Sequence, residues 1–257
     1  MKKLNLTKNN VRHPVYAGSF YPASKKDLTT TLQQLLSENK SNKFKGKLRA
    51  LIVPHAGYIY SGPIAAFSYN ALLSTLPKKI ILFGPTHHIY LQDAYSFAED
   101  WETPIKCTKV TSADLPIIKN DKEHCLEVQL PFLQFVLKEF KFTPILYGEM
   151  DAKELADIIN NEMDEDSVLI ASSDLSHYLN YDVAKKVDNK TIEAILKLDY
   201  DNFLKIGDAC GKIGIAALIV LAKKYNWKPI LLDYRNSKDT ASDKNNVVGY
   251  TSIAFVE

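Results

Sequence analysis

The chain has 257 residues, of which 46% are hydrophobic and 24% charged, and its formal net charge is +2. This length fits one large α/β domain or two small ones, and it is long enough to bury a sizeable core. The near-neutral charge gives no reason to expect nucleic acid or an anionic membrane as a partner. The cysteines are widely spaced without a C-x-x-C pair, which disfavours a disulfide framework or a zinc ribbon. Without a signal peptide or an apolar run of about 18 residues, the sequence predicts a cytoplasmic globular protein.

Strands and helices alternate along the chain, as judged from hydrophobic periodicity and turn signals. The first predicted elements are a polar lead-in (1–12), a turn-rich aromatic loop (13–24), a helix capped by Ser24 (to about 38), a strand (48–53), a helix (65–73), a strand (79–84) and a sheet or hairpin region (95–111). The later ones are a helix (123–137), a strand (142–148), a helix (152–163), a strand (168–171), two helices (181–197 and 212–225), and two strands (228–234 and 247–256) around a polar loop (235–246). Pro131 would kink the helix at 123–137 or mark a new helix start. This alternation predicts that residues 13–257 form a single three-layer α/β/α sandwich with a mostly parallel or mixed sheet.

Two of the predicted strands are each followed by a histidine. The strand at 48–53 leads into His55, and the strand at 79–84 leads into His87 and His88. Ligands of open α/β sheets bind in the crevice beyond the carboxyl ends of the strands, so these rings are expected at one rim of the sheet. Successive residues of an extended segment point to opposite sides, so only one of the adjacent pair should face the site. The other is expected to support it or to pack nearby.

Other polar groups are weaker candidates for the same site. His177 follows Asp174 by three residues, close enough for the carboxylate to orient the ring of a general base or ligand. His124 and Glu127 share one face of the predicted helix, where a simple hydrogen bond is the commoner role. Asp239 lies in the polar loop before the last strand, where a plain surface position is the simpler interpretation.

Two histidines and one carboxylate around an open position are typical of non-haem Fe(II) oxygen chemistry. The lack of nearby cysteine motifs disfavours a closed structural zinc site. The sequence contains no G-x-S-x-G, H-E-x-x-H, Walker or G-x-G-x-x-G motif. A serine hydrolase that uses Ser172 or Ser173 with His177 stays open as an alternative.

Six ordered motifs resemble those of one known family. They are HPVYAGSFYPAS, PHAGYIYSGPIAA, GPTHH, EHCLEVQLPFL, SSDLSHY and VVGYTSIAF, and they span residues 13–257. Together they resemble the Memo family, whose prokaryotic members are called AmmeMemoRadiSam system protein B. That family is similar in fold to the class III extradiol ring-cleavage dioxygenases, so the resemblance implies one α/β/α sandwich.

The resemblance also implies roles for particular residues. His55 and His87 align with the metal-ligand histidines, and His177 aligns with the active-site histidine of the dioxygenases. The third ligand is a glutamate in the ring-cleaving enzymes and a cysteine in some family members. Thr240 falls at that column, and the neighbouring Asp239 is the carboxylate that could substitute for it. The system name implies association with an AMMECR1-domain protein and a radical S-adenosylmethionine enzyme.

Three functions follow as hypotheses. The first is a metal-dependent redox or dioxygenase-like enzyme that holds Fe(II), with copper or zinc as alternatives, at His55, His87 and Asp239 or Thr240. In this hypothesis Asp174 and His177 handle protons, and the residues expected to line the pocket are His124, Glu127, His88 and Tyr58. The second is a non-catalytic adaptor with an aromatic groove for a peptide or a protein partner, formed by Tyr16, Phe20, Tyr21, Tyr58 and Tyr60. The third is a metallohydrolase, because ligand types alone do not select oxygen chemistry over hydrolysis.

Overall fold

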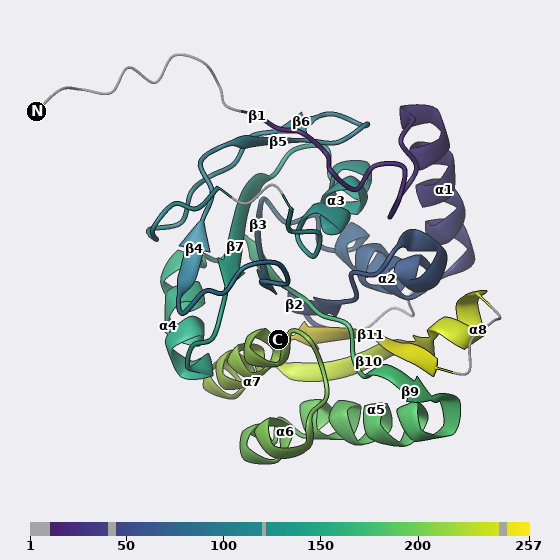
Figure 1. Cartoon of the computed structure of the whole chain (residues 1–257). Helices are drawn as coiled ribbons and strands as arrows, with labels where there is room; N and C mark the ends of the chain where they lie inside the picture. The colour runs from purple at the N-terminus through teal and green to yellow at the C-terminus, as the bar shows by residue number, and fades with distance from the viewer. Residues whose placement is uncertain (1–10, 41–44, 120–121, 242–245) are drawn as a thin grey trace, which may run out of the picture.

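The computed structural model describes residues 11–40, 45–119, 122–241 and 246–257, which fold into the predicted α/β/α sandwich (Figure 1). The strands of its main sheet, in spatial order, are β10 (Lys228–Asn236), β11 (Asn246–Val256), β2 (Leu48–Val53), β8 (Ser167–Ser172), β3 (Lys79–Pro85), β7 (Lys141–Tyr147) and β4 (Ala94–Ser96), and β9 (His177–Asn180) pairs with β11. The four central strands, β2, β8, β3 and β7, are parallel, and the flanking pairs are antiparallel. The sheet is therefore mixed around a parallel centre.

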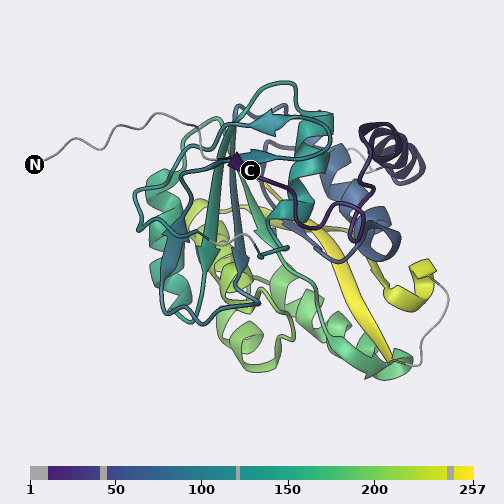
Figure 2. The same ribbon diagram turned by 45° about the horizontal axis from the view of Figure 1, so that its top comes forward.

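Helices cover both faces of the sheet, as Figure 2 shows with the top of the molecule turned forward. One layer holds α1 (Lys25–Glu38), α2 (Tyr58–Leu73), the short 3-10 helix η1 (Glu127–Gln129) and α3 (Leu130–Val136). The other layer holds α4 (Ala152–Glu162), α5 (Tyr181–Leu196), α6 (Tyr200–Ile206) and α7 (Lys212–Tyr225). The remaining helix, α8 (Ser237–Ala241), lies between β10 and β11 in the chain.

The central strands are mainly apolar because both of their faces are covered. In β2, Leu51 and Val53 pack in the core beneath α1 and α2, whereas Ala50 and Ile52 pack toward α4 and α7. Strand β3 divides its side chains between the two cores in the same way. Such continuous burial is typical of parallel strands, and it explains why these runs lack a polar alternation.

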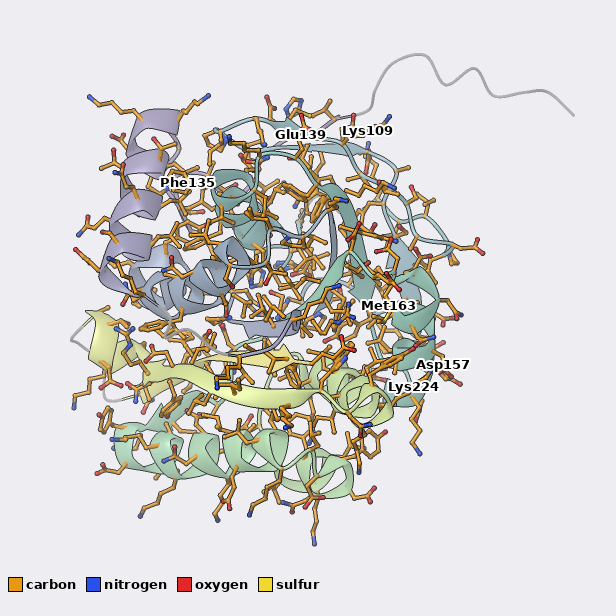
Figure 3. The ribbon with its side chains drawn as sticks, turned by 180° about the vertical axis from the view of Figure 1, so that it is seen from behind. Lys109, Phe135, Glu139, Asp157, Met163 and Lys224 are labelled. Carbon is orange, nitrogen blue, oxygen red and sulfur yellow. The ribbon has the colours of Figure 1, made fainter. Side chains whose placement is uncertain are left out.

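The outer surfaces of the helices are polar. On α4, Asp151 caps the first turn by accepting from the backbone N–H groups of Lys153 and Glu154, and Leu155 and Ile159 face the core. Figure 3 shows the molecule from behind, with Asp157 of α4 and Lys224 of α7 on neighbouring outer surfaces. None of the helices in the described ranges is both long enough and apolar enough to cross a membrane.

The last two residues of the predicted polar lead-in contribute to the fold. Val11–Arg12 form β1, which pairs with β5 (Asp100–Glu102), and β5 pairs in turn with β6 (Cys107–Thr108). The buried guanidinium of Arg12 lies 4.4 Å from the centre of the Trp101 ring. Residues 1–10, the rest of the lead-in, lie outside the described residues.

Several other boundaries differ from the prediction. Helix α2 begins at Tyr58, earlier than predicted, because Gly57 is its N-cap and the helix accommodates Pro63. The second alternative for Pro131 is confirmed, since it lies at the start of α3. Short α6 and α8 were not predicted because five to seven residues carry too little periodicity to reveal a helix. Part of the predicted loop, residues 242–245, lies outside the described residues.

Candidate metal centre

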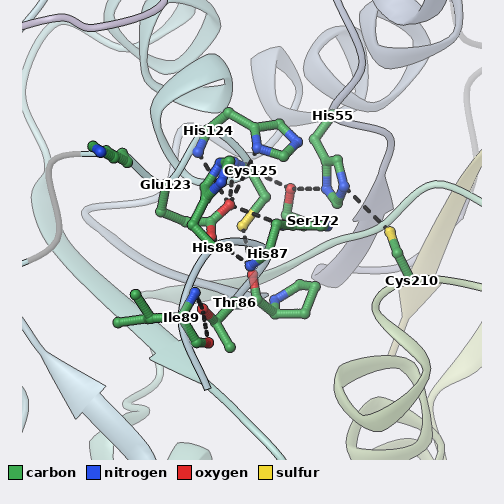
Figure 4. A network of polar contacts seen from close by, with 12 residues as sticks. His55, Thr86, His87, His88, Ile89, Glu123, His124, Cys125, Ser172 and Cys210 are labelled. Carbon is green, nitrogen blue, oxygen red and sulfur yellow. Dashed lines mark hydrogen bonds and ion pairs between the residues drawn. The ribbon is translucent and has the colours of Figure 1, made fainter. Parts of the chain in front are cut away.

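The two histidine-bearing strand ends meet at one rim of the sheet. Strands β2 and β3 both pair in parallel with β8, so their carboxyl ends lie on either side of Ser172. The rings of His55 and His87 lie with their centroids 5.1 Å apart and nearly perpendicular. Figure 4 shows them together with Ser172, Glu123 and Cys210.

The tautomer of His55 follows from the bonds of Ser172. The Ser172 hydroxyl donates to the carbonyl oxygen of Cys125 at 2.6 Å, so its oxygen can only accept from other groups. It accepts from the side-chain amide of Gln129, and Nδ1 of His55 lies 3.0 Å from it. Nδ1 of His55 must therefore carry the proton, which leaves the lone pair on Nε2. Burial, with the neighbouring His87 second, lowers the pKa of His55 well below its usual value, so the ring is neutral.

Glu123 holds the His87 ring at its Nδ1 atom, as Ser172 holds that of His55. Its carboxylate accepts from the backbone N–H of His87 at 2.7 Å, and its other oxygen lies 2.9 Å from Nδ1 of that ring. Burial alone would raise the pKa of Glu123, but the bonds from His87 outweigh it and lower the pKa to about 2. An ionised carboxylate accepts the Nδ1 proton, so in the neutral form of this ring the lone pair is on Nε2. Carboxylates that orient metal-binding histidines act in this way.

A cysteine, not the predicted carboxylate, completes the group. The Sγ atom of Cys210 lies 3.2 Å from Nε2 of His55, and one ligand atom each from His55, His87 and Cys210 lie within 4.8 Å of one another. Burial, with Asp174 second, raises the pKa of the Cys210 thiol to about 12, so it is protonated without a metal.

The structure does not bring Asp239 or Thr240, the expected third ligands, into this group. The exposed carboxylate of Asp239 accepts from the hydroxyl of Tyr181 and from the backbone N–H of Asn236. The Thr240 hydroxyl donates to the carbonyl oxygen of Ser237, within helix α8. Both side chains serve the local structure of α8, whose capping the sequence pattern did not reveal.

His124 lies against both candidate ligand rings, and His88 lies farther out, beyond His124. The His124 ring lies 4.5 Å from that of His87 and 5.3 Å from that of His55, measured between centroids. Burial, with His55 second, lowers the pKa of His124 to about 3, so this ring is neutral as well. Nε2 of His88 lies 3.2 Å from the hydroxyl of Tyr16, which itself donates to the carbonyl oxygen of Lys122. His88 therefore supports the N-terminal loop beside the site.

Glu127 and Tyr58, expected to line the same pocket, lie in the core. Glu127 is fully buried, pairs with Arg12 at 2.7 Å, and accepts from the Tyr16 backbone N–H and the Tyr21 hydroxyl. The Tyr58 hydroxyl donates to the carbonyl oxygen of Val128, and its ring packs between Tyr21 and other aromatics. Tyr58 does line a separate groove of about 620 Å³ between the N-terminal loop and α1. Glu127 thus anchors the loop instead of facing a ligand.

Asp174 holds His55 instead of His177. Its buried carboxylate accepts from the backbone N–H of His55 at 2.7 Å, and no hydrogen bond joins it to the His177 ring in the described part of the chain. His177 is half-buried at the start of β9, which pairs with β11. The carboxylate therefore fixes the turn after β2. Burial raises the pKa of Asp174 to about 6, although the hydrogen bond from the His55 backbone N–H acts to lower it.

This pKa predicts how stability depends on pH. Because the pKa rises from 3.8 to about 6 on folding, the protonated carboxyl favours the fold. That stabilisation is complete below about pH 4 and is lost as the pH rises through 6, amounting to about 3 kcal/mol. Asp174→Asn does not titrate, so its stability relative to the metal-free wild type should increase between about pH 4 and pH 7.5. Urea unfolding across this range measures the difference, and a difference independent of pH would contradict the assignment.

Sequence reasoning missed Ser172 as a histidine partner, as well as Glu123 and Cys210. Ser172 ends β8, so the placement of that strand between the two histidine strands was the signal needed to find its role. Glu123 precedes His124 and was read as the start of a helix, whereas it lies before η1 in an irregular turn. Cys210 directly precedes the Gly211 cap of α7 and belongs to no recognisable ligand motif.

The fold and this site define an α/β/α protein with a histidine- and cysteine-lined centre at the carboxyl ends of its parallel strands. The family model for Memo-like protein matches residues 12–254. A MEMO1 family protein of Thermoplasma volcanium is 33% identical over 95% of this chain and 97% of its own length. MEMO1 family proteins of Saccharolobus islandicus and Nitrosopumilus maritimus are 35% and 32% identical, covering 99% and 100% of those proteins. The chain belongs to the Memo family, which confirms the resemblance.

Proposed function

We propose that this protein binds one redox-active transition metal, iron(II) or copper, through His55, His87 and Cys210, and acts as an oxidoreductase. One observation carries the proposal. Both imidazoles are held at Nδ1 by fixed acceptors, Ser172 and Glu123, and Nε2 of His55 faces the Cys210 thiol at 3.2 Å. Two oriented imidazoles and a thiol have little other reason to converge at a strand-end rim.

The residues present fit such a metal. Imidazole suits iron, copper and zinc, and thiolate favours the softer members of this group. Among the described residues, the group that contains both histidines has three protein ligands, and the His87 side chain is 26% exposed, so a further position remains for a small molecule. Sites that perform chemistry keep an open position of this kind, whereas structural sites are closed by protein ligands.

The chain's own residues would set the protonation of the centre. A redox metal, when bound, supplies the one-electron and oxygen chemistry that amino-acid side chains lack. Cys210 must give up its proton for ligation, so metal binding should release a proton and tighten as the pH rises. The neutral His124 ring lies next to both ligand histidines, where it can exchange a hydrogen bond with a bound molecule.

A matched pair of cysteine variants tests the proposal. Metal-free protein is titrated anaerobically with Cu(I), Fe(II) and the spectroscopic probe Co(II), and bound metal and visible absorption are measured. We expect one metal per chain and a thiolate-to-cobalt absorption band that Cys210→Ala abolishes and Cys107→Ala, at an exposed cysteine, preserves. Wild-type protein that holds no metal would refute the proposal, and a band unchanged in Cys210→Ala would remove this thiol from the centre.

Ser172→Ala should weaken metal binding. The change removes the acceptor of the His55 Nδ1 proton, so the ring can turn or change tautomer. The loss of such a supporting bond typically costs about 10–100-fold in metal affinity. Ser68→Ala is the control, because Ser68 is equally buried but bonds to Ser252 and Ile52. Competition with a metal chelator measures both affinities, and equal affinities would mean that Ser172 does not position His55.

A second candidate, a non-catalytic adaptor, is favoured by the groove of about 620 Å³ lined by Phe20, Tyr21, Tyr58 and Ile59. Association with an AMMECR1-domain protein and a radical S-adenosylmethionine enzyme belongs to this candidate and stays a prediction. A pulldown whose yield is unaffected by His55→Ala and His87→Ala would support it. Hydrolytic chemistry remains the third candidate if zinc is the metal that binds.

A further inference from the structure

A second cavity, of about 420 Å³, adjoins the candidate metal centre. Its wall includes Cys210, together with Pro85 and Thr86, which immediately precede His87. Tyr147 and the two residues that follow it, at the end of β7, form another side. The cavity therefore lies at the carboxyl ends of β3 and β7, the part of an open α/β sheet where ligands bind. A molecule in it would lie directly beside a proposed metal ligand.

Most of the wall is apolar. Ile89, Leu91 and Ile213 contribute aliphatic side chains, and Tyr90 and Tyr147 contribute rings. Ile89 is 42% exposed and Tyr90 is 69% exposed, so both side chains are accessible to a ligand that enters from solvent. A volume of this size accommodates a small molecule of one or two rings.

The charged groups of the wall are one cation and one anion. Lys212 follows Cys210 after a single glycine, and its side chain has neither an ion pair nor a hydrogen bond with any residue in the described ranges. The exposed Glu149 carboxylate accepts from the hydroxyl of Tyr90 at 3.3 Å. Lys212 can therefore balance one negative charge on a ligand, whereas a dianion such as a phosphate would retain one uncompensated negative charge.

We propose that this cavity binds the substrate of the metal centre, and that the substrate is a flat, mainly apolar molecule with one carboxylate. Lys212 is the residue that selects the carboxylate, and the ligand body extends along Tyr90 and Ile213 toward Cys210. That the ligand is a substrate rests on the proposed function, but its binding does not require metal. Lys212 is thus a specificity-determining residue of a site that sequence reasoning did not identify.

The test uses benzoate as the probe and benzamide as its uncharged equivalent of the same shape. Each is titrated into the metal-free full chain while backbone amide NMR signals, among them that of Gly148 in the cavity wall, are followed. We expect benzoate to bind about fivefold more tightly than benzamide, because a partly solvated charged hydrogen bond from Lys212 to the carboxylate contributes about that much affinity. Lys212→Gln should remove that advantage and leave benzamide unchanged. Lys223→Gln, at an exposed lysine near the other end of α7, should change neither.

The outcomes separate this proposal from the metal proposal. Equal binding of the two probes, or equal behaviour of Lys212→Gln and Lys223→Gln, would overturn the carboxylate site whatever the metal content. No perturbation of the cavity signals by either probe would overturn it as well. Lysine-dependent benzoate binding in a protein that takes up no metal would keep the site and refute its link to a metal-dependent reaction. The metal affinity of Lys212→Gln should equal that of the wild type. This result would show that the variant folds and that Lys212 affects ligand binding alone.

Discussion

His87→Ala is expected to abolish stoichiometric metal binding. The change removes one of the two imidazoles of the candidate centre, and it leaves the buried Glu123 carboxylate without the ring that it orients. Removal of supporting groups alone typically costs about 10–100-fold in affinity, so the loss of a direct ligand should exceed about 100-fold. His55→Ala should behave alike. Metal content after anaerobic loading and gel filtration, with the affinity from chelator competition, measures the loss.

His88→Ala is the matched control for this prediction. His88 is adjacent in the same loop and is also exposed, but its ring contacts the Tyr16 hydroxyl instead of the centre. The control variant should retain one metal per chain with an affinity within about threefold of wild type, as expected for a surface substitution. If His87→Ala and His88→Ala lose metal equally, the His87 ring is not a specific ligand of the metal.

Glu127→Gln is expected to cause the largest loss of stability. The Glu127 carboxylate is fully buried against the Arg12 guanidinium and also accepts from Tyr16 and Tyr21. The amide of glutamine would place a donor against other donors and leave the buried guanidinium without its counter-charge. Breaking a buried pair on one side typically costs about 3–5 kcal/mol. Urea unfolding should show this decrease in the free energy of unfolding.

A surface glutamate provides the comparison. Glu193 pairs with Lys197 one helical turn away on α5, where both side chains are well exposed. Glu193→Gln should leave the unfolding midpoint unchanged within error, because solvent screens such pairs. If the two variants were equally stable, the Arg12–Glu127 contact would not hold the N-terminal segment in place.

The sequence was sufficient to predict the sandwich because its central strands carry an unmistakable physical signal. The runs ending at Val53 and at Pro85 are buried on both faces, and each stops at a turn-forming residue before a histidine. A parallel arrangement then brings their ends together regardless of the loops between them. For this reason the proximity of His55 to one of the two histidines after Pro85 could be anticipated without knowledge of any contact.

The rest of the centre could not be predicted because its members come from segments without periodicity. Cys210 follows an irregular stretch before α7, and its position depends on how α7 packs against the sheet. By ligand type, Asp239 was a better candidate than Thr240. Its carboxylate instead accepts from the Tyr181 hydroxyl and from the backbone N–H of Asn236. The role of Ser172 depends on the order of strands in the sheet, a long-range property that hydrophobic patterns do not contain.

The contact between Cys210 and His55 spans 155 positions of the chain, and that between Arg12 and Glu127 spans 115. Contacts between such distant residues form slowly, because a long loop must close before they stabilise anything. During synthesis the two histidines leave the ribosome long before the thiol does. The complete ligand set therefore exists only in a nearly finished molecule, so metal loading should follow folding and should not guide it.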